Sequence, residues 1–239
     1  MPAGLKIENA VVLVTGANRG IGRALVDAAL QRGASKVYAA MRTPRPLGLP
    51  RVEEVVLDVT SETQVRDAAA RCTDVTLVIN NAGIADPGGF LAPESLSACQ
   101  RHIETNVYGL LRMAQAFAPV LAARGGGAML NILSVASWIN SPMLGAYGLS
   151  KAAAWALTNG LRIELREQNT LVAGLHVGFV DTDLARQIDM PKLPASEVAE
   201  RALAGIEAGE EEILVGERAL QIKRGLTADP PVYLALGRR

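Results

Sequence analysis

The sequence predicts an α/β fold in which helices cover both faces of a parallel β-sheet. Segments with strand and helix patterns alternate along the chain, and the strand segments are continuous runs rich in Val, Ile and Leu. Such runs indicate strands that are buried on both faces, as in a parallel sheet between two helical layers. The composition (49% hydrophobic, 20% charged, 4% aromatic) suits an aliphatic sheet packed by alanine-rich helices.

The predicted elements follow in chain order. We expect seven strands, at residues 11–14, 36–41, 52–57, 75–80, 128–133, 171–177 and 212–215. Helical patterns occupy residues 21–31, 61–71, 94–124, 147–167 and 196–208, and the third is long enough for two helices. Residues 43–51 contain Pro44, Pro46 and Pro50, so we expect an extended connection there instead of a helix.

Residues 1–239 are expected to form one domain, because no repeat, linker or low-complexity tract interrupts the pattern. The 24 basic and 24 acidic side chains give a net charge of zero, which argues against nucleic-acid binding. Neither a signal segment nor a bilayer-length apolar run is visible, so we expect a cytoplasmic protein without membrane contact. Cys72 and Cys99 are expected to be reduced thiols, although a disulfide stays open.

A glycine-rich turn links the first strand to the first helix. Its sequence is TGANRGIG, with Gly16, Gly20 and Gly22. A dinucleotide pyrophosphate must approach the backbone N–H groups at the helix N-terminus, where the helix dipole favours negative charge, and side chains would block that approach. The turn therefore favours a dinucleotide site. The alternative is a tight strand-to-helix turn that binds nothing.

Further motifs follow this turn. The sequence NNAG occupies residues 80–83, after the fourth strand, and Asn106, Ser134, Tyr147 and Lys151 come later. In order and approximate spacing, these motifs resemble the short-chain dehydrogenase/reductase family over nearly the whole chain, except the tail after Gly216. The resemblance implies a doubly wound, Rossmann-type domain of about seven parallel strands that binds a nicotinamide dinucleotide.

The resemblance also implies which residues hold the cofactor. They lie in the glycine turn, after strands two, three, four and six, and in the catalytic helix: Gly16, Asn18, Arg19, Gly20, Ile21, Gly22, Arg42, Asp58, Val59, Asn80, Ala82, Gly83, Tyr147, Lys151, Gly178, Val180 and Thr182. Asp58 would accept a bond from the adenine amino group, and it could also cap a helix. The family carries Pro-Gly after the sixth strand, whereas this chain has Val177-Gly178, so the proline of the family pattern is absent from this loop.

The end of the second strand favours NADP(H) over NAD(H). A carboxylate at this point binds the ribose 2′-OH of NAD, whereas a basic group binds the 2′-phosphate of NADP. This strand ends Ala40-Met41-Arg42 with no carboxylate nearby, and Arg19 in the glycine turn supplies a second cation. The alternative is that both arginines are solvated surface residues.

Tyr147 and Lys151 are four residues apart in a predicted helix, so they share one face. Carbonyl reduction needs a proton for the developing alkoxide, and a phenol, with an ordinary pKa of about 10, can supply it. An ammonium about 4 Å away contributes about 4 kcal/mol at an effective dielectric constant of about 20, which we expect to lower the phenol pKa to about 7. A packing or cation–π pair is the alternative.

Ser134 and Asn106 complete the expected catalytic group. Ser134 ends the fifth strand, at the edge where open α/β sheets bind ligands, and its hydroxyl would hold the substrate oxygen. By resemblance, Asn106 supports a water chain from Lys151; otherwise it is a helix-internal polar residue. We therefore expect an NADPH-dependent carbonyl reductase or alcohol dehydrogenase that interconverts a ketone or aldehyde and an alcohol, with Tyr147 as general acid and base.

The substrate side and the quaternary structure are less defined. Five residues line the substrate site or are ordinary core or subunit contacts: Trp138, Met143, Phe179, Leu184 and Ile188. His102 and His176 are expected to be structural, with no metal site. The resemblance implies a homo-dimer or homo-tetramer through helices around residues 101–124 and 147–167.

Two other functions stay open. A catalytically silent, nucleotide-sensing regulator would use the same fold, but such relatives usually lack the tyrosine or the lysine, and this chain has both. Epimerases and dehydratases of sugar nucleotides carry a longer C-terminal substrate domain, for which 239 residues leave no room.

Overall fold

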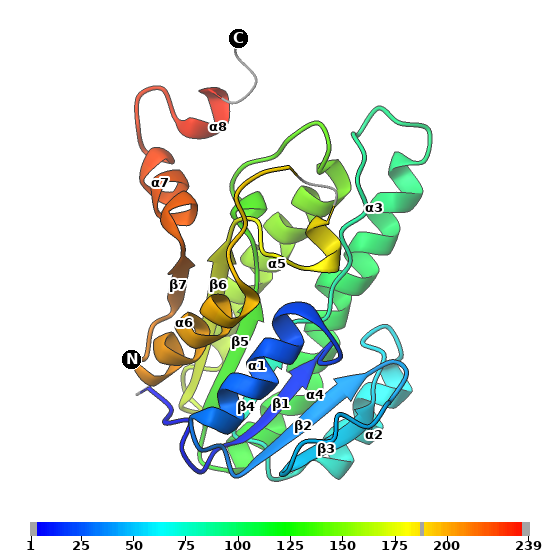
Figure 1. The fold of residues 1–239 in the computed structure, drawn as a ribbon, viewed down its shortest axis with the longest axis vertical. Coiled ribbons are helices and arrows are strands. Elements are labelled where there is room, and N and C mark those ends of the chain that lie inside the picture. The colour runs from blue at the N-terminus through cyan, green and yellow to red at the C-terminus, as the bar shows by residue number, and fades with distance from the viewer. Residues whose placement is uncertain (1–3, 187–188, 236–239) are drawn as a thin grey trace.

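The computed structural model describes residues 4–186 and 189–235 and contains a seven-stranded parallel sheet (Figure 1). Its strands are β1 (Val11–Thr15), β2 (Lys36–Met41), β3 (Val52–Val56), β4 (Leu77–Asn80), β5 (Gly127–Ile132), β6 (Thr170–Val177) and β7 (Glu212–Val215). Their spatial order is β3-β2-β1-β4-β5-β6-β7, and every neighbouring pair is parallel. The predicted α/β class, with its doubly wound Rossmann-type sheet, is confirmed.

Helices cover both faces of this sheet. They are α1 (Gly20–Gln31), α2 (Glu62–Arg71), α3 (Ser95–Ile103), α4 (Gly109–Ala123), α5 (Gly145–Glu164), α6 (Ala195–Glu207), α7 (Glu217–Gly225) and α8 (Val232–Ala235). In Figure 1, α1 and α6 lie side by side in front of the sheet. They bury Leu25 and Val198 in one apolar cluster, while α2, α4 and α5 bury Val65, Phe117 and Leu161 in a second cluster on the other face.

Two connections bear on the site. The second crossover has no helix between β2 and β3, as the prolines predict, and its loop is held by a bond from the Leu47 N–H to the Glu54 carboxylate (2.8 Å). The helical pattern at 94–124 forms α3 and α4, as expected, but a π-helical turn, Glu104–Tyr108, joins them without a break. Single π-helical turns within α-helices are frequent at functional sites.

The order of the strands locates a binding edge. The chain adds β2 and β3 on one side of β1 and then returns to place β4 on the other side. Ligands of open α/β sheets bind where the strand order reverses in this way, outside the carboxyl ends of the strands. The tail after Gly216 carries no motif; it forms α7, which follows β7 directly, and then α8 farther from the sheet. No helix within the described residues is both long and apolar enough to cross a membrane.

Candidate active site

The glycine turn lies between β1 and α1. Gly16 and Gly20 have positive φ angles of 67° and 54°, which side chains disfavour. A Cβ on Gly22 would lie 2.2 Å from the Gly16 carbonyl oxygen, so only glycine fits there. Arg19, at the N-cap, makes no capping bond with its side chain, and the first turn of α1 holds no acidic residue. The turn therefore has the open backbone and uncapped N–H groups that a pyrophosphate requires.

Asn81 fixes the shape of this turn. Its side-chain amide donates to the carbonyl oxygens of Thr15 (2.9 Å) and Gly16 (3.3 Å). The Thr15 hydroxyl in turn accepts the backbone N–H of Ala82 at 3.0 Å. Asn81 belongs to the NNAG motif but was not among the residues expected in the site. Since β1 and β4 are neighbours, this residue ties their carboxyl ends together.

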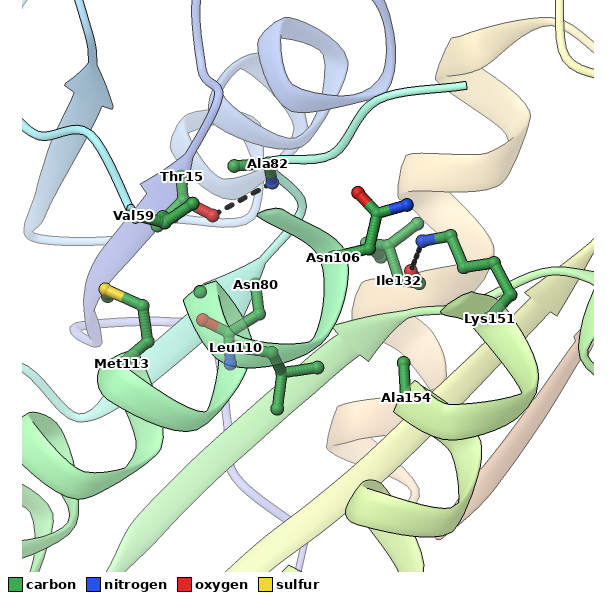
Figure 2. Close-up of a pocket in the computed structure, with 11 residues that line it drawn as sticks. Thr15, Val59, Asn80, Ala82, Asn106, Leu110, Met113, Ile132, Lys151 and Ala154 are labelled. Carbon is green, nitrogen blue, oxygen red and sulfur yellow. Dashed lines mark hydrogen bonds between the residues drawn. The ribbon is translucent and has the colours of Figure 1, made fainter. Parts of the chain in front are cut away.

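A small polar cavity of about 10 Å³ lies behind the turn, and its lining includes Asn80, Ala82, Asn106 and Lys151 (Figure 2). Such a volume holds about one water molecule. The buried Oδ1 atom of Asn80 has no hydrogen-bond partner among the described residues. Five of the predicted site residues (these four and Val59), from four different parts of the chain, therefore meet around one cavity, where the Asn80 acceptor is unsatisfied among the described residues.

Asn106 is buried in the π-helical turn and makes three side-chain bonds. Its amide donates to the Ile84 carbonyl (3.0 Å) and to the Ser150 hydroxyl (2.9 Å), and its oxygen accepts the Ile84 N–H at 2.9 Å. Asn106 thus joins the loop after β4 to helix α5, which carries Tyr147 and Lys151. An ordinary helix-surface asparagine would not make these bonds.

Tyr147 and Lys151 lie one turn apart on α5, with the Lys151 nitrogen 5.7 Å from the centre of the Tyr147 ring. The Lys151 ammonium is buried and donates to the Ile132 carbonyl at 2.7 Å, as Figure 2 shows. Burial lowers the pKa of Lys151 to about 8, because the charged form loses its hydration.

The expected lowering of the phenol pKa by Lys151 is wrong for this structure. Burial raises the pKa of Tyr147 above its ordinary value, and hydrogen bonding with the Ser134 hydroxyl opposes that rise. An ammonium attracts a phenolate, but both groups lose their hydration in a buried site, and this loss raises the phenol pKa. The proximity of Tyr147 to Ser134 is as expected.

Ser134 lies two residues beyond β5 and begins a short 3₁₀ turn. Its hydroxyl accepts the Ala136 N–H (3.1 Å) and donates weakly to the Val177 carbonyl (3.4 Å). The Nδ1 atom of His176 donates to the Ser134 carbonyl at 3.1 Å. Burial lowers the pKa of His176 to about 4, so the ring is neutral and supports the Ser134 backbone. His176 therefore has the expected structural role.

The remaining predicted cofactor residues border the same edge of the sheet. Thr182 lies against the glycine turn, with its methyl group 3.1 Å from where a Cβ on Gly20 would stand. Arg19 forms an ion pair with Asp183 at 2.8 Å, which lowers the pKa of that carboxyl group. Arg42 is exposed just beyond β2.

Asp58 makes local bonds in the turn before α2, because its carboxylate accepts both the N–H (2.9 Å) and the hydroxyl (2.8 Å) of Thr60, while the N-cap of α2 is Ser61. Val59 lines the small cavity of Figure 2. Val180 pairs with Leu193 across the loop after β6. The local bonds of Asp58 leave its expected adenine contact as a prediction.

The residues expected on the substrate side have different surroundings. Trp138 stacks on His176, with ring centres 3.9 Å apart, and belongs to the apolar cluster under α7. Met143 is exposed, and the Phe179 ring lies under Arg218 at 5.2 Å. Ile188 lies outside the described residues. The packing of α7 against Trp138 and Phe179 was not predicted, because the residues of α7 form no recognisable motif.

Cysteines and metal ligands add no further chemistry to the described part of the chain. Cys72 and Cys99 are free thiols, as expected. Across residues 4–186 and 189–235, no three His, Cys, Asp or Glu side chains are grouped to hold a metal ion.

Comparisons with known proteins agree with this geometry. Residues 10–192 match the family model described as short chain dehydrogenase. A short chain dehydrogenase of Penicillium aethiopicum is 32% identical over 205 residues, which cover 77% of this chain and 81% of that protein. A crystal structure of a short chain dehydrogenase from Burkholderia cenocepacia in complex with NADP is 37% identical, with a TM-score of 0.94 over 98% of this chain and 100% of that one. A Burkholderia phymatum enzyme in complex with NAD, 24% identical, shares the fold at a TM-score of 0.83 over 98% of this chain and 97% of that one.

Proposed function

The chain belongs to the short-chain dehydrogenase family, and from that membership we propose that it is an NADP(H)-dependent reductase of ketones or aldehydes. The observation that carries the proposal is the position of Tyr147 on α5, one helical turn from the buried Lys151, whose nitrogen lies 5.7 Å from the centre of the Tyr147 ring; Ser134 follows β5 beside them. A general acid, an oxygen-binding hydroxyl and a buried ammonium are the groups that carbonyl reduction needs.

The raised pKa of Tyr147 supports the reductive direction. A phenol with a pKa above 10 is protonated at neutral pH, so it can donate a proton to a developing alkoxide. Ser134 would hold the substrate oxygen, and Lys151, with a pKa of about 8, can return a proton to Tyr147. The cofactor, when bound, supplies the hydride. Oxidation of the alcohol requires the phenolate, so its rate should rise with pH.

The residues present fit a dinucleotide. The glycine turn is too crowded for side chains and leaves its N–H groups without a side-chain cap, and Asn80 offers nearby an acceptor that no described residue pairs with. Arg42 and Arg19 support a preference for the 2′-phosphate of NADP(H), as does the NADP held by the Burkholderia cenocepacia relative. Asn106 and Lys151, at the same small cavity, support a water-linked path for protons.

The proposed preference has a direct test at residue 42. Arg42→Asp places a carboxylate on an exposed position after β2, whereas the side chain of Met41 is buried and cannot be replaced by a charge without cost. We expect the ratio of kcat/KM for NADPH to that for NADH to fall by about 10-fold or more. A ratio equal to that of the wild type contradicts the role of Arg42.

A substrate screen tests the activity itself. The wild type is assayed with ketones, aldehydes and quinones by following NADPH absorbance, beside NADH and the reverse reaction with alcohols. We expect cofactor oxidation with at least one carbonyl class. Binding of NADPH without turnover across the panel would favour the silent, nucleotide-sensing regulator instead.

The assembly and location of the protein are also proposals. We propose that residues 1–239 act as one domain in the cytoplasm and associate as homo-dimers or homo-tetramers. Tyr108 beside α4, and Leu149 and Ile163 on α5, are exposed apolar side chains on the two helices expected to form the contact. Small molecules are the proposed substrates.

A further inference from the structure

We infer that Arg45, in the loop between β2 and β3, binds the ribose 2′-phosphate of NADP(H) together with Arg42. The inference rests on the proposed function, because it assigns a cofactor-selecting residue to the same dinucleotide site. Arg45 was not among the residues expected from the sequence. It lies four residues beyond the end of β2, in the proline-rich connection.

A hydrogen bond brings Arg45 to the glycine turn. Its guanidinium Nη2 donates to the carbonyl oxygen of Asn18 at 3.0 Å. The same turn is tied to the end of β2, because the Ala17 N–H donates to the Ala40 carbonyl at 3.2 Å. Arg45 thus lies where the glycine turn meets the carboxyl end of β2. In dinucleotide-binding folds, the 2′ group of the adenosine ribose binds at this place.

The charges at this corner are uncompensated. Arg42 and Arg45 are both exposed, and neither forms an ion pair with a carboxylate of the described residues. Arg19, the other basic residue of the turn, is instead paired with Asp183. Arg45 uses one N–H on Asn18, so its other donors remain for a ligand. Two unpaired guanidinium groups suit a phosphate monoester, which they can bind through paired N–H bonds.

The loop holds Arg45 in place before any ligand binds. Pro44 and Pro46 flank it and restrict the backbone. Leu47 beyond them bonds to the Glu54 carboxylate and packs on the core, and the Arg51 carbonyl accepts the Val37 N–H at 2.9 Å. A cation on a pre-ordered loop loses little conformational entropy on binding. This distinguishes Arg45 from a freely moving surface arginine.

The other reading of Arg45 is that it only fixes the glycine turn through Asn18. The two roles differ in their effect on the two cofactors. Loss of a turn-fixing bond weakens NADPH and NADH equally, because both carry the pyrophosphate. Loss of a 2′-phosphate ligand weakens only NADPH. Arg45→Gln separates the roles further, since its amide can still donate to Asn18 but carries no charge.

The test measures Kd for NADPH, NADH, 2′,5′-ADP and 5′-AMP by calorimetry. The proteins are the wild type, Arg45→Ala, Arg45→Gln and the control Arg66→Ala, which removes an exposed ion pair on α2. In both Arg45 variants we expect binding of NADPH and 2′,5′-ADP to weaken by about 10- to 100-fold, with NADH and 5′-AMP within about threefold. The control should match the wild type on all four ligands.

Two results overturn the assignment. One is an Arg45→Gln protein that keeps the wild-type affinity for NADPH. The other is an equal loss for NADPH and NADH in Arg45→Ala, which identifies a turn-fixing role. If the wild type binds neither cofactor, the proposed function fails and this inference fails with it. If the wild type prefers NADPH and Arg45→Gln prefers it to the same degree, the inference about Arg45 is overturned while the proposed function stands.

Discussion

Replacing Lys151 by methionine should change how the stability of the cofactor-free protein depends on pH. Lys151 is only 8% exposed, and its pKa falls from an ordinary value of 10.5 to about 8. At neutral pH it is protonated in both the folded and the unfolded state, and the folded state carries the cost of the buried charge. Above pH 8 the folded protein releases this proton while the unfolded chain still holds it. The unfolded state then binds more protons, so stability rises with pH.

The size of this effect follows from the pKa. One pKa unit corresponds to about 1.4 kcal/mol, so lowering the pKa of Lys151 to about 8 costs about 3 kcal/mol at neutral pH. About 2.5 kcal/mol of this cost is recovered by about pH 10. The wild type should therefore gain about 2.5 kcal/mol over Lys151→Met between about pH 7 and pH 10. The comparison cancels contributions from groups that both proteins share, such as the buried Cys72 thiol.

The assay is urea unfolding of both proteins across this pH range. Lys6→Met is the matched control, because Lys6 is exposed and its replacement should leave the pH dependence unchanged. Carbonyl reduction should be lost in Lys151→Met although the fold is kept. If the unfolding free energies of the wild type and Lys151→Met change with pH in parallel, the claim that the buried Lys151 ammonium destabilises the folded protein at neutral pH is refuted.

The other predictions concern stability at three further positions. His176 has a folded-state pKa of about 4 against an ordinary 6.5, so the unfolded chain takes up its proton first as the pH falls. Relative to His176→Gln, the wild type should lose about 3 kcal/mol of unfolding free energy between about pH 7 and pH 4. If the difference in unfolding free energy between the two proteins is the same at both pH values, the claim that the ring is buried and neutral is contradicted. Gly22→Ala places a methyl 2.2 Å from the Gly16 carbonyl and should cost about 1–3 kcal/mol in thermal or urea unfolding. Gly160→Ala, whose Cβ meets nothing within 4 Å, should instead stabilise by about 0.5–1 kcal/mol, and similar losses in both variants would refute the crowding argument.

Much of the fold was predictable because its signals are local. The continuous apolar runs identified all seven strands to within two residues at each end. The three prolines at 44, 46 and 50 predicted that no helix joins β2 to β3. The spacing of Tyr147 and Lys151 placed both on one helix face, and strand-end positions brought Ser134 near them.

The remaining features depend on tertiary contacts that no local pattern encodes. The bond from Arg45 to Asn18 joins residues 27 positions apart and depends on the path of an irregular loop. The π-helical turn around Asn106 and the packing of α7 on Trp138 have no sequence signature. The direction of the Tyr147 pKa was mispredicted because burial, which only the folded chain reveals, raises this pKa more than the Ser134 hydroxyl lowers it.

The most direct test of the proposed mechanism is the turnover number of Tyr147→Phe with NADPH and the best carbonyl substrate from the screen. The substitution removes the phenol hydroxyl and keeps the ring. We predict a fall of about 10²–10⁴-fold in kcat while the Kd for NADPH stays within about threefold of the wild type. Equal kcat values for the two proteins would contradict the role of Tyr147 as the proton donor.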